Sequence, residues 1–362
     1  MNDRVFNFNP GPATLPLEAL EEAQKELLNF NHTGMSVLEI SHRSKEFEKL
    51  VLEAEALMKE LMGLSDDFKV LFLQGGASMQ FAMIPLNFLP AGKTADYVVT
   101  GSFAAKAQKE AAILGNTHIA YSTKEEGHKR IPRQEELNFS SCPAYVHITT
   151  NNTIYGTQWQ YIPDTKGVPL VADMSSDILS RSQDYSSYSL IYAGAQKNLG
   201  PAGVTVVVVH RAMLEKVPAT LPNILRLDVH AKNNSLYNTP PAFAIYMVNK
   251  VLHWAKRQGG LKEIENNNRQ KAALIYDVID KHQEFFLGHA EKNCRSIMNV
   301  TFRLPSQELE NTFLAEAEKL KLVGLKGHRS VGGIRASIYN AMPRQGCLSL
   351  AQFMEDFYQK YA

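Results

Sequence analysis

The chain has 362 residues, of which 38 are Lys or Arg and 37 are Asp or Glu, so its formal net charge is +1. At roughly 100 to 200 residues per domain, this length predicts one large or two ordinary domains with a sizeable core. A balanced charge lacks the basic surface needed to bind a phosphate backbone, and we therefore expect no nucleic-acid partner. Because 44% of the residues are apolar, extensive disorder is not expected.

Cysteine usage and the first residues bear on the compartment. Cys142, Cys294 and Cys347 are the three cysteines and form no CxxC pair, which argues against a disulfide framework or a cysteine zinc site. Residues 1–8 lack the charged-then-apolar pattern of a secretory leader, and no apolar run approaches the ~18 residues of a membrane span. We expect a cytoplasmic protein without a membrane partner.

The first part of the chain repeats one arrangement twice, a short apolar run followed by a small-residue turn and a helical pattern. Two such units in succession predict an α/β protein with a mostly parallel sheet covered by helices on both faces. The predicted elements here are helices at 17–30 and 46–64, a strand at 69–73, a helix at 79–88, a strand at 95–99 and a helix at 103–114.

Short apolar runs continue to residue 210, and the chain then becomes helical and charged from Gly260 to His282. We place a domain boundary there, with a large domain at 16–264 and a smaller α/β domain made of 1–15 and 265–362. The predicted elements are strands at 144–149, 168–172, 189–193, 204–210, 297–304 and 333–339, and helices at 308–320 and 348–361.

Lys197 follows an apolar run and stands among small residues, from Gly194 to Gly203. Glycines let other groups approach closely, and a lysine in such surroundings can have a lowered pKa and act as an amine nucleophile. Taken alone, an ordinary loop lysine is the alternative.

Asp173 ends the apolar run 168–172, and ligands collect at the carboxyl ends of strands in open α/β sheets. Asp173 and Lys197 can therefore face one ligand. A pyridoxal phosphate enzyme needs this pair, a lysine for the Schiff base and an Asp that keeps the ring nitrogen protonated. A cap for the following turn is the alternative role for Asp173.

Residues 74–78, Gln-Gly-Gly-Ala-Ser, join a predicted strand to a helix. Their backbone N–H groups and the helix dipole can hold a phosphate dianion without a lysine. The segment lacks the spacing of GxGxxG or GxxxxGK[ST], so neither a dinucleotide site nor a P-loop is supported. Tight packing at the turn also accounts for two glycines.

Two His-Arg pairs, His42-Arg43 and His328-Arg329, occur near opposite ends of the chain, and Arg335 follows the second. Arginine binds carboxylates and phosphates bidentately. Each pair alone could be a surface charge patch, but the repetition favours an anion site. The histidines show no HExxH or HxH spacing, and we expect no metal.

Over nearly the whole chain the sequence resembles the phosphoserine aminotransferases, class-V members of the fold-type I pyridoxal phosphate-dependent transferases. The motifs that carry this resemblance are Phe6-Asn7-Phe8-Asn9-Pro10-Gly11-Pro12-Ala13, Glu39-Ile40-Ser41-His42-Arg43, Asn151-Asn152-Thr153-Ile154-Tyr155-Gly156-Thr157, Gln196-Lys197-Asn198, Asn238-Thr239-Pro240-Pro241 and Arg335-Ala336-Ser337-Ile338-Tyr339-Asn340-Ala341.

The resemblance implies pyridoxal 5′-phosphate as cofactor. Lys197 matches the lysine that forms the Schiff base and shuttles the proton, Asp173 the partner of the pyridine nitrogen, and Thr153 a polar contact at the ring edge. The phosphate cradle matches Ala77, Ser78 and Gln196, completed by Asn238 and Thr239 from the neighbouring subunit of a homodimer.

The resemblance also implies transamination of O-phospho-L-serine with 2-oxoglutarate to 3-phosphooxypyruvate and L-glutamate in serine biosynthesis. Family members also act on 4-phosphohydroxy-L-threonine in vitamin B6 (pyridoxine) synthesis. Arg335 matches the residue that pairs with the α-carboxylate. The residues that match the site for the distal phosphate or carboxylate are His42, Arg43, His328 and Arg329, from either subunit.

One position departs from many relatives. Phe103 stands beside Ser102 where numerous members carry a tryptophan that stacks on the ring. We expect Phe103 to stack in its place, with an altered cofactor affinity or spectrum.

Three alternatives remain. A cysteine desulfurase favours a His before the lysine, where this chain has Gln196. An aminotransferase for small neutral amino acids would not need two His-Arg pairs. A non-catalytic scaffold on the same fold would not need Lys197, Asp173 and both pairs together.

Overall fold

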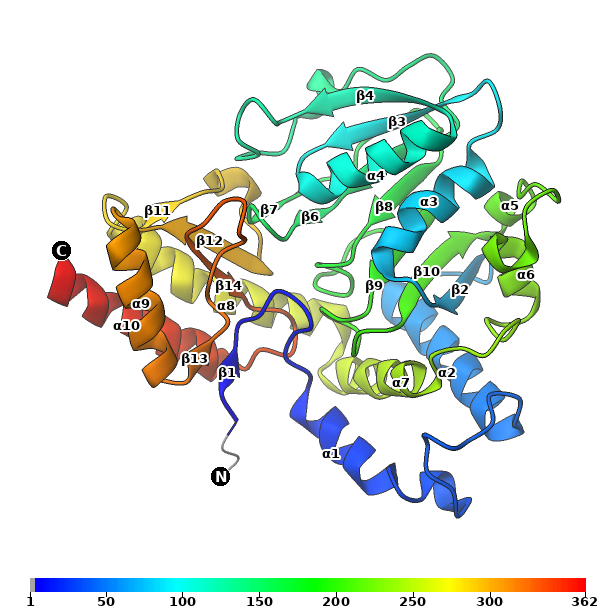
Figure 1. Cartoon of the computed structure of the whole chain (residues 1–362), viewed down its shortest axis with the longest axis horizontal. Coiled ribbons are helices and arrows are strands. Elements are labelled where there is room, and N and C mark those ends of the chain that lie inside the picture. Colours follow the sequence, from blue (N-terminus) through cyan, green and yellow to red (C-terminus); the bar gives the residue numbers. More distant parts are fainter. Residues whose placement is uncertain (1–3) are drawn as a thin grey trace.

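The computed structural model describes residues 4–362. A seven-stranded sheet with the order β2-β10-β9-β8-β5-β3-β4 forms the centre of its larger part (Figure 1). Strands β9, β8, β5, β3 and β4 pair in parallel, whereas β10 is antiparallel to both β9 and β2. The strands are β2 (Phe68–Leu73), β3 (Thr94–Val99), β4 (Asn116–Ser122), β5 (Val146–Thr149), β8 (Leu170–Asp173), β9 (Leu190–Gly194) and β10 (Thr205–His210). The mostly parallel sheet is confirmed.

Helices cover both faces of this sheet, as the continuous apolar runs of its strands require. On one face α2 (Lys45–Met62) and α7 (Ala242–Arg257) pack on Val70, Val206 and Ile191. On the other face α3 (Gly76–Phe88) and α4 (Ser102–Leu114) pack on Leu71 and Val207.

Three predicted helix boundaries are wrong. Helix α10 (Arg344–Tyr361) begins before the predicted residue 348. The first helix, α1 (Leu17–Glu26), ends before the predicted residue 30, and Phe30 begins a separate 3-10 turn. Helix α3 begins at Gly76 and not at Met79, because Gly75, with φ of 94°, lets the chain turn directly from β2 into the helix.

The smaller part contains a three-stranded antiparallel sheet, β11-β12-β14. Figure 1 shows this sheet beside the large one, with α9 and α10 on its outer side. Its elements are α8 (Gly260–Lys281), β11 (Leu287–Gly288), β12 (Asn299–Arg303), α9 (Gln307–Lys319), β13 (Leu322–Val323), β14 (Ile334–Ser337) and α10 (Arg344–Tyr361). Strand β1 (Phe6–Asn7) pairs in parallel with β13.

Short elements complete the chain. They are β6 (Asn151–Asn152), β7 (Thr157–Gln158), α5 (Arg211–Leu214), α6 (Leu227–Lys232) and the 3-10 turns Phe30–His32, Gln134–Glu136, Tyr185–Ser187, Asn223–Leu225 and Lys292–Cys294.

The expected domain boundary at 264/265 falls inside α8, which is continuous across it. Leu261 and Ile264 belong to the core under the large sheet, whereas Ile275 belongs to a second core that also includes Phe8. This distribution supports the two-domain division with the N-terminal residues in the smaller domain, and we keep that division as a proposal.

Among residues 4–362, no helix combines the length and apolar character that crossing a membrane requires.

Candidate active site

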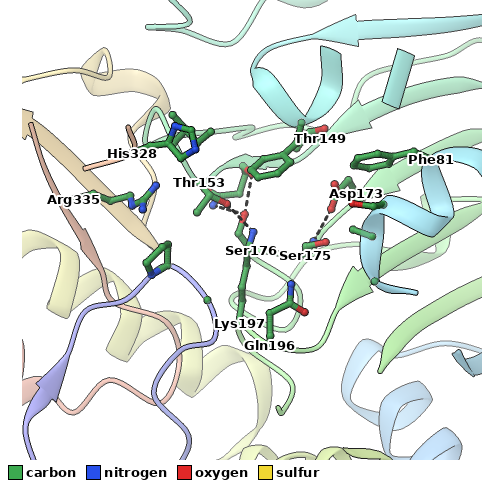
Figure 2. A pocket seen from close by; sticks show the side chains of 18 residues that line it. Phe81, Thr149, Thr153, Asp173, Ser175, Ser176, Gln196, Lys197, His328 and Arg335 are labelled. Atoms are coloured by element: carbon green, nitrogen blue, oxygen red, sulfur yellow. Dashed lines mark hydrogen bonds between the residues drawn. The ribbon is translucent and has the colours of Figure 1, made fainter. Parts of the chain in front are cut away.

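A cavity of about 280 Å³ lies between the large sheet and strand β14 of the smaller sheet. The carboxyl ends of β5 and β8, the start of α3 and strand β14 all contribute to its wall. Figure 2 shows Lys197 rising into this cavity, with Asp173 and Phe81 on one side and Arg335 and His328 on the other. The cavity therefore brings together groups that are far apart in the sequence.

Lys197 lies in the turn that follows β9, and its side chain projects into the cavity. Its Nζ donates a hydrogen bond of 2.9 Å to Thr153 Oγ1. Burial lowers the pKa of Lys197 to about 8, and the negative charge of Asp173 opposes part of that shift. A large fraction of this amine is therefore neutral, and nucleophilic, at mildly alkaline pH.

Asp173 is the last residue of β8 and is buried. Its Oδ1 accepts a hydrogen bond of 2.9 Å from the Ser175 backbone N–H. Burial raises the pKa of Asp173, while the hydrogen bonds from Ser175 and the charge of Lys197 counteract the rise. A carboxylate in this position can hold a protonated ring nitrogen, whose positive charge would offset the cost of its burial.

The first turn of α3 is suited to binding an anion. The N–H groups at the start of a helix have no partner within the helix, and the helix dipole makes this end positive. Ala77 and Ser78 line the cavity there together with Gln196. Gly76, with φ of 65°, has no atom within 4 Å of the position a Cβ would take, which leaves the approach open. This end of α3 fits a phosphate dianion.

Arg335 lies on β14, and its backbone N–H donates to Leu325 O at 2.7 Å. Its side chain is buried, and its Nε has no hydrogen-bond partner among the described residues. Such a guanidinium is prepared for an external carboxylate. His328 also lines the cavity, where partial burial and the positive charge of Arg335 lower its pKa.

The structure does not bring all predicted residues into the cavity of one chain. Arg329 is exposed and does not line it. Four other predicted site residues also do not line the cavity: His42, Arg43, Asn238 and Thr239. His42 and Asn238 are half-buried, Arg43 and Thr239 are exposed, and the segment between α1 and α2 that carries the first pair lies at the lower edge of the molecule in Figure 1.

Phe103 lines the cavity near Lys197, whose Nζ lies 5.4 Å from the centre of the phenyl ring. A second cation, Lys106, lies 5.3 Å from the same ring and contributes to the lowered pKa of His328. Lys106 follows Phe103 by three residues on α4, and this spacing alone predicts that the two side chains lie on the same face of the helix.

Several further cavity residues were missed from the sequence, among them Thr149, Ser175, Ser176 and Phe81. Thr149 ends β5, the neighbour of β8, so the rule that found Asp173 applies to it as well. Ser175 and Ser176 follow Asp173 almost directly. Phe81 had no such signal, because a buried phenylalanine on a helix usually belongs to the core.

The residues of this chain fit pyridoxal 5′-phosphate. An amine with a lowered pKa, a buried carboxylate, an aromatic ring and a helix N-terminus surround one cavity. These match the four features of the cofactor, its aldehyde, its ring nitrogen, its ring face and its phosphate.

Comparison with known proteins agrees with this geometry. The family model of the class-V aminotransferases matches residues 5–350. The phosphoserine aminotransferase of Herpetosiphon aurantiacus is 58% identical over 356 residues, covering 98% of this chain and 99% of that protein. The phosphoserine aminotransferase of Bacillus subtilis is 52% identical over 358 residues, covering 99% of each.

Solved structures show the same likeness. The phosphoserine aminotransferase from Bacillus circulans subsp. alkalophilus superposes with a TM-score of 0.98 at 53% identity, covering 100% of both chains. A pyridoxal phosphate-bound phosphoserine aminotransferase from Trichomonas vaginalis gives a TM-score of 0.92 at 37% identity, covering 97% of this chain and 100% of that one. The chain belongs to the class-V aminotransferases, and its cofactor is pyridoxal 5′-phosphate.

Proposed function

We propose that this chain catalyses the reversible transamination of O-phospho-L-serine with 2-oxoglutarate, giving 3-phosphooxypyruvate and L-glutamate, as in serine biosynthesis. The observation that carries the proposal is a single cavity that joins Lys197 and Asp173 to the unpaired guanidinium of Arg335. Full-length relatives at 52% to 58% identity carry the name phosphoserine aminotransferase.

When bound, pyridoxal phosphate supplies an electron sink for negative charge developing at the substrate Cα. Asp173 keeps the ring nitrogen protonated. Lys197, in its neutral form, would take the proton from the substrate Cα and donate it again later in the reaction. Thr153 orients the amine through the 2.9 Å hydrogen bond. Phe103 packs on the ring face, and Ala77, Ser78 and Gln196 bind the phosphate.

The substrate residues divide into two groups. Arg335 pairs with the α-carboxylate, which every substrate carries. His328 and Arg329, together with His42 and Arg43, bind the distal phosphate of phosphoserine or the distal carboxylate of glutamate and 2-oxoglutarate. One cationic region then serves both partners of the reaction because both are anionic at the far end.

We propose a homodimer with its active sites at the subunit interface. Asn238 and Thr239 do not line the cavity of their own chain, which agrees with a role in the partner's phosphate cradle. His42 and Arg43 are also absent from the cavity of their own chain, and we assign them to the partner's site, whereas Arg329 is kept with the cavity-lining His328 that it follows. 4-Phosphohydroxy-L-threonine, used in pyridoxine synthesis, stays a predicted second substrate because it shares the distal phosphate, and the cytoplasm stays the predicted location.

The test is the visible spectrum of the protein loaded with pyridoxal phosphate, recorded as each amino acid is added. Phosphoserine and glutamate should each convert the cofactor to its amine form. Alanine and cysteine should react more slowly by about 100-fold or more, since each lacks a charge-assisted contact worth about 3 kcal/mol. A preference for alanine would remove the substrate assignment, and protein that stays colourless with pyridoxal phosphate would favour a non-catalytic scaffold.

A further inference from the structure

Lys271 on α8 is fully buried, and its ammonium is held by the main chain alone in the contacts that the structure records. Burial lowers the pKa of Lys271 to about 8, so the group is largely cationic at neutral pH. Four carbonyl oxygens share its three N–H groups, those of Ile338 at 3.1 Å, Tyr339 at 2.8 Å, Asn340 at 3.3 Å and Met342 at 3.1 Å from Nζ.

These carbonyls belong to the corner formed by residues 338–342, which connects β14 to α10. Several carbonyl oxygens converging on one point repel one another unless a cation lies between them. The ammonium of Lys271 therefore stabilises the shape of this corner, and a neutral apolar side chain of similar length would leave these carbonyls without its N–H donors.

The corner also joins the two walls of the active-site cavity. The Asn340 backbone N–H donates to Asn198 Oδ1 at 3.0 Å, and Asn198 directly follows Lys197. Tyr339 Oη donates to the carbonyl oxygen of Pro10 at 2.7 Å, and Pro10 lines the cavity.

Arg335 lies on the strand that enters the corner, and Ser337 ends that strand. The strand is thus attached through residues 338–342 to the loop that carries the lysine. This attachment links Arg335 to the loop of Lys197, in addition to the pairing of β14 with β12 that holds the strand itself.

We propose that Lys271 is a positioning residue for substrate binding, whose ammonium holds the corner 338–342 and so places Arg335 relative to Lys197. The inference rests on the proposed assignment of Arg335 to the substrate α-carboxylate. It assigns to Lys271 no contact with substrate or cofactor.

The test is K271M, which keeps the length of the side chain and removes the ammonium. The KM values for phosphoserine, glutamate and 2-oxoglutarate should rise by a common factor of roughly 10, because all three share the α-carboxylate, while kcat changes much less. The visible spectrum and the cofactor dissociation constant should stay within about 2-fold of the wild type, because Lys197 and the phosphate cradle are intact.

K69M is the matched control. Lys69 is also buried, and its Nζ donates to Glu55 Oε2 at 2.6 Å and Asn234 Oδ1 at 2.8 Å, away from the cavity. Both variants should lower the melting temperature, but only K271M should raise KM. A K271M enzyme that is less stable yet has wild-type KM values would overturn the inference.

N198L gives a second route to the same test, because it removes the acceptor of the Asn340 N–H and leaves the contacts of Lys271 in place. N198L should also raise KM for all three substrates. If K271M does not accumulate as folded enzyme, N198L provides the test of the inference. Wild-type KM values in N198L would then overturn the inference.

R335Q distinguishes the proposed role of Arg335 in binding the α-carboxylate from the proposed role of Lys271 in positioning Arg335. A raised KM in R335Q with unchanged values in K271M and N198L would remove the role of Lys271 alone. Unchanged KM values in R335Q would remove the assignment of Arg335, and with it the inference.

Discussion

Lys197 Nζ donates a hydrogen bond of 2.9 Å to Thr153 Oγ1, which joins the turn after β9 to the loop between β6 and β7. The bond keeps a long, buried side chain in one orientation, so part of the conformational entropy cost of positioning the amine is met on folding. It also directs the amine toward the cavity that Thr153 and Asp173 share.

The lowered pKa of Lys197 predicts how the cofactor-free protein captures pyridoxal phosphate. Only the neutral amine attacks an aldehyde, so the rate of capture should rise with pH, reach half of its maximum near pH 8 and level off at higher pH, where most of the amine is neutral. In D173N the negative charge that favours the ammonium is lost, and the midpoint should move to lower pH. Rapid-mixing absorption measurements check both, and a midpoint near the ordinary lysine value would contradict the burial argument.

Ser78→Asp separates cofactor binding from helix stability. An Asp in the first turn of α3 interacts favourably with the helix dipole, by about 0.3 to 1 kcal/mol, so the cofactor-free protein should be as stable as the wild type or more so. The same carboxylate repels the cofactor phosphate, and the dissociation constant of pyridoxal phosphate should rise. Thermal unfolding and equilibrium dialysis provide the two readouts. Unchanged cofactor affinity would place the phosphate elsewhere.

Phe103 should contribute to cofactor affinity through its ring face. An aromatic pair adds about 0.5 to 1.5 kcal/mol beyond its buried area, so F103A should raise the dissociation constant of pyridoxal phosphate at least about 2- to 12-fold. F103W, with a larger ring, should bind at least as tightly as the wild type and shift the visible spectrum. If F103A binds the cofactor with wild-type affinity, Phe103 does not stack on the ring.

The ion pair of Lys69 and Glu55 links β2 to α2 in the core, at 2.6 Å between Nζ and Oε2. K69M should lower the free energy of unfolding by about 3 to 5 kcal/mol, because it leaves the Glu55 carboxylate buried without its cation. The double variant K69M/E55M should be more stable than K69M, since it removes that carboxylate as well. Urea unfolding measures both, and equal losses in the two variants would show that the ion pair is not the cause.

Much of the central sheet could be predicted from the sequence, because strands buried on both faces appear as continuous apolar runs. Strand β4 was not predicted by this rule. It lies at the edge of the sheet, and its residues alternate without a clear apolar side. Helix α7 was also not predicted, although Pro240 and Pro241 precede it and its buried residues follow helical spacing.

Some residues of the candidate site could also be predicted from general rules, and others could not. Asp173 and the cradle at Ala77 and Ser78 follow from general rules about strand ends and helix starts. The approach of Arg335 to Lys197 does not follow from such rules, because it depends on how the smaller sheet packs beside the large one, with Asn340 bonded to Asn198. His42 and Arg43 do not line the cavity of their own chain, so their role stays a proposal that depends on the proposed homodimer.

The proposed active site at the subunit interface predicts complementation between two variants that we expect to be inactive. K197A lacks the amine to which we assign the proton transfer. R43A lacks the guanidinium that we propose to bind the substrate phosphate in the partner's cavity. In a mixed dimer, one site carries both lesions and the other carries neither, so mixing the two variants under conditions of subunit exchange should restore activity. At equal amounts half of the dimers are mixed, each with one intact site, so activity should approach about a quarter of the wild type when subunits exchange at random.

A mixture of K197A with D173N is the control. Both residues line the cavity of the same chain, so every site in a mixed dimer carries one lesion and no activity should return. Recovery with R43A but not with D173N would place Arg43 in the partner's site, whereas no recovery with R43A would return Arg43 to the site of its own chain.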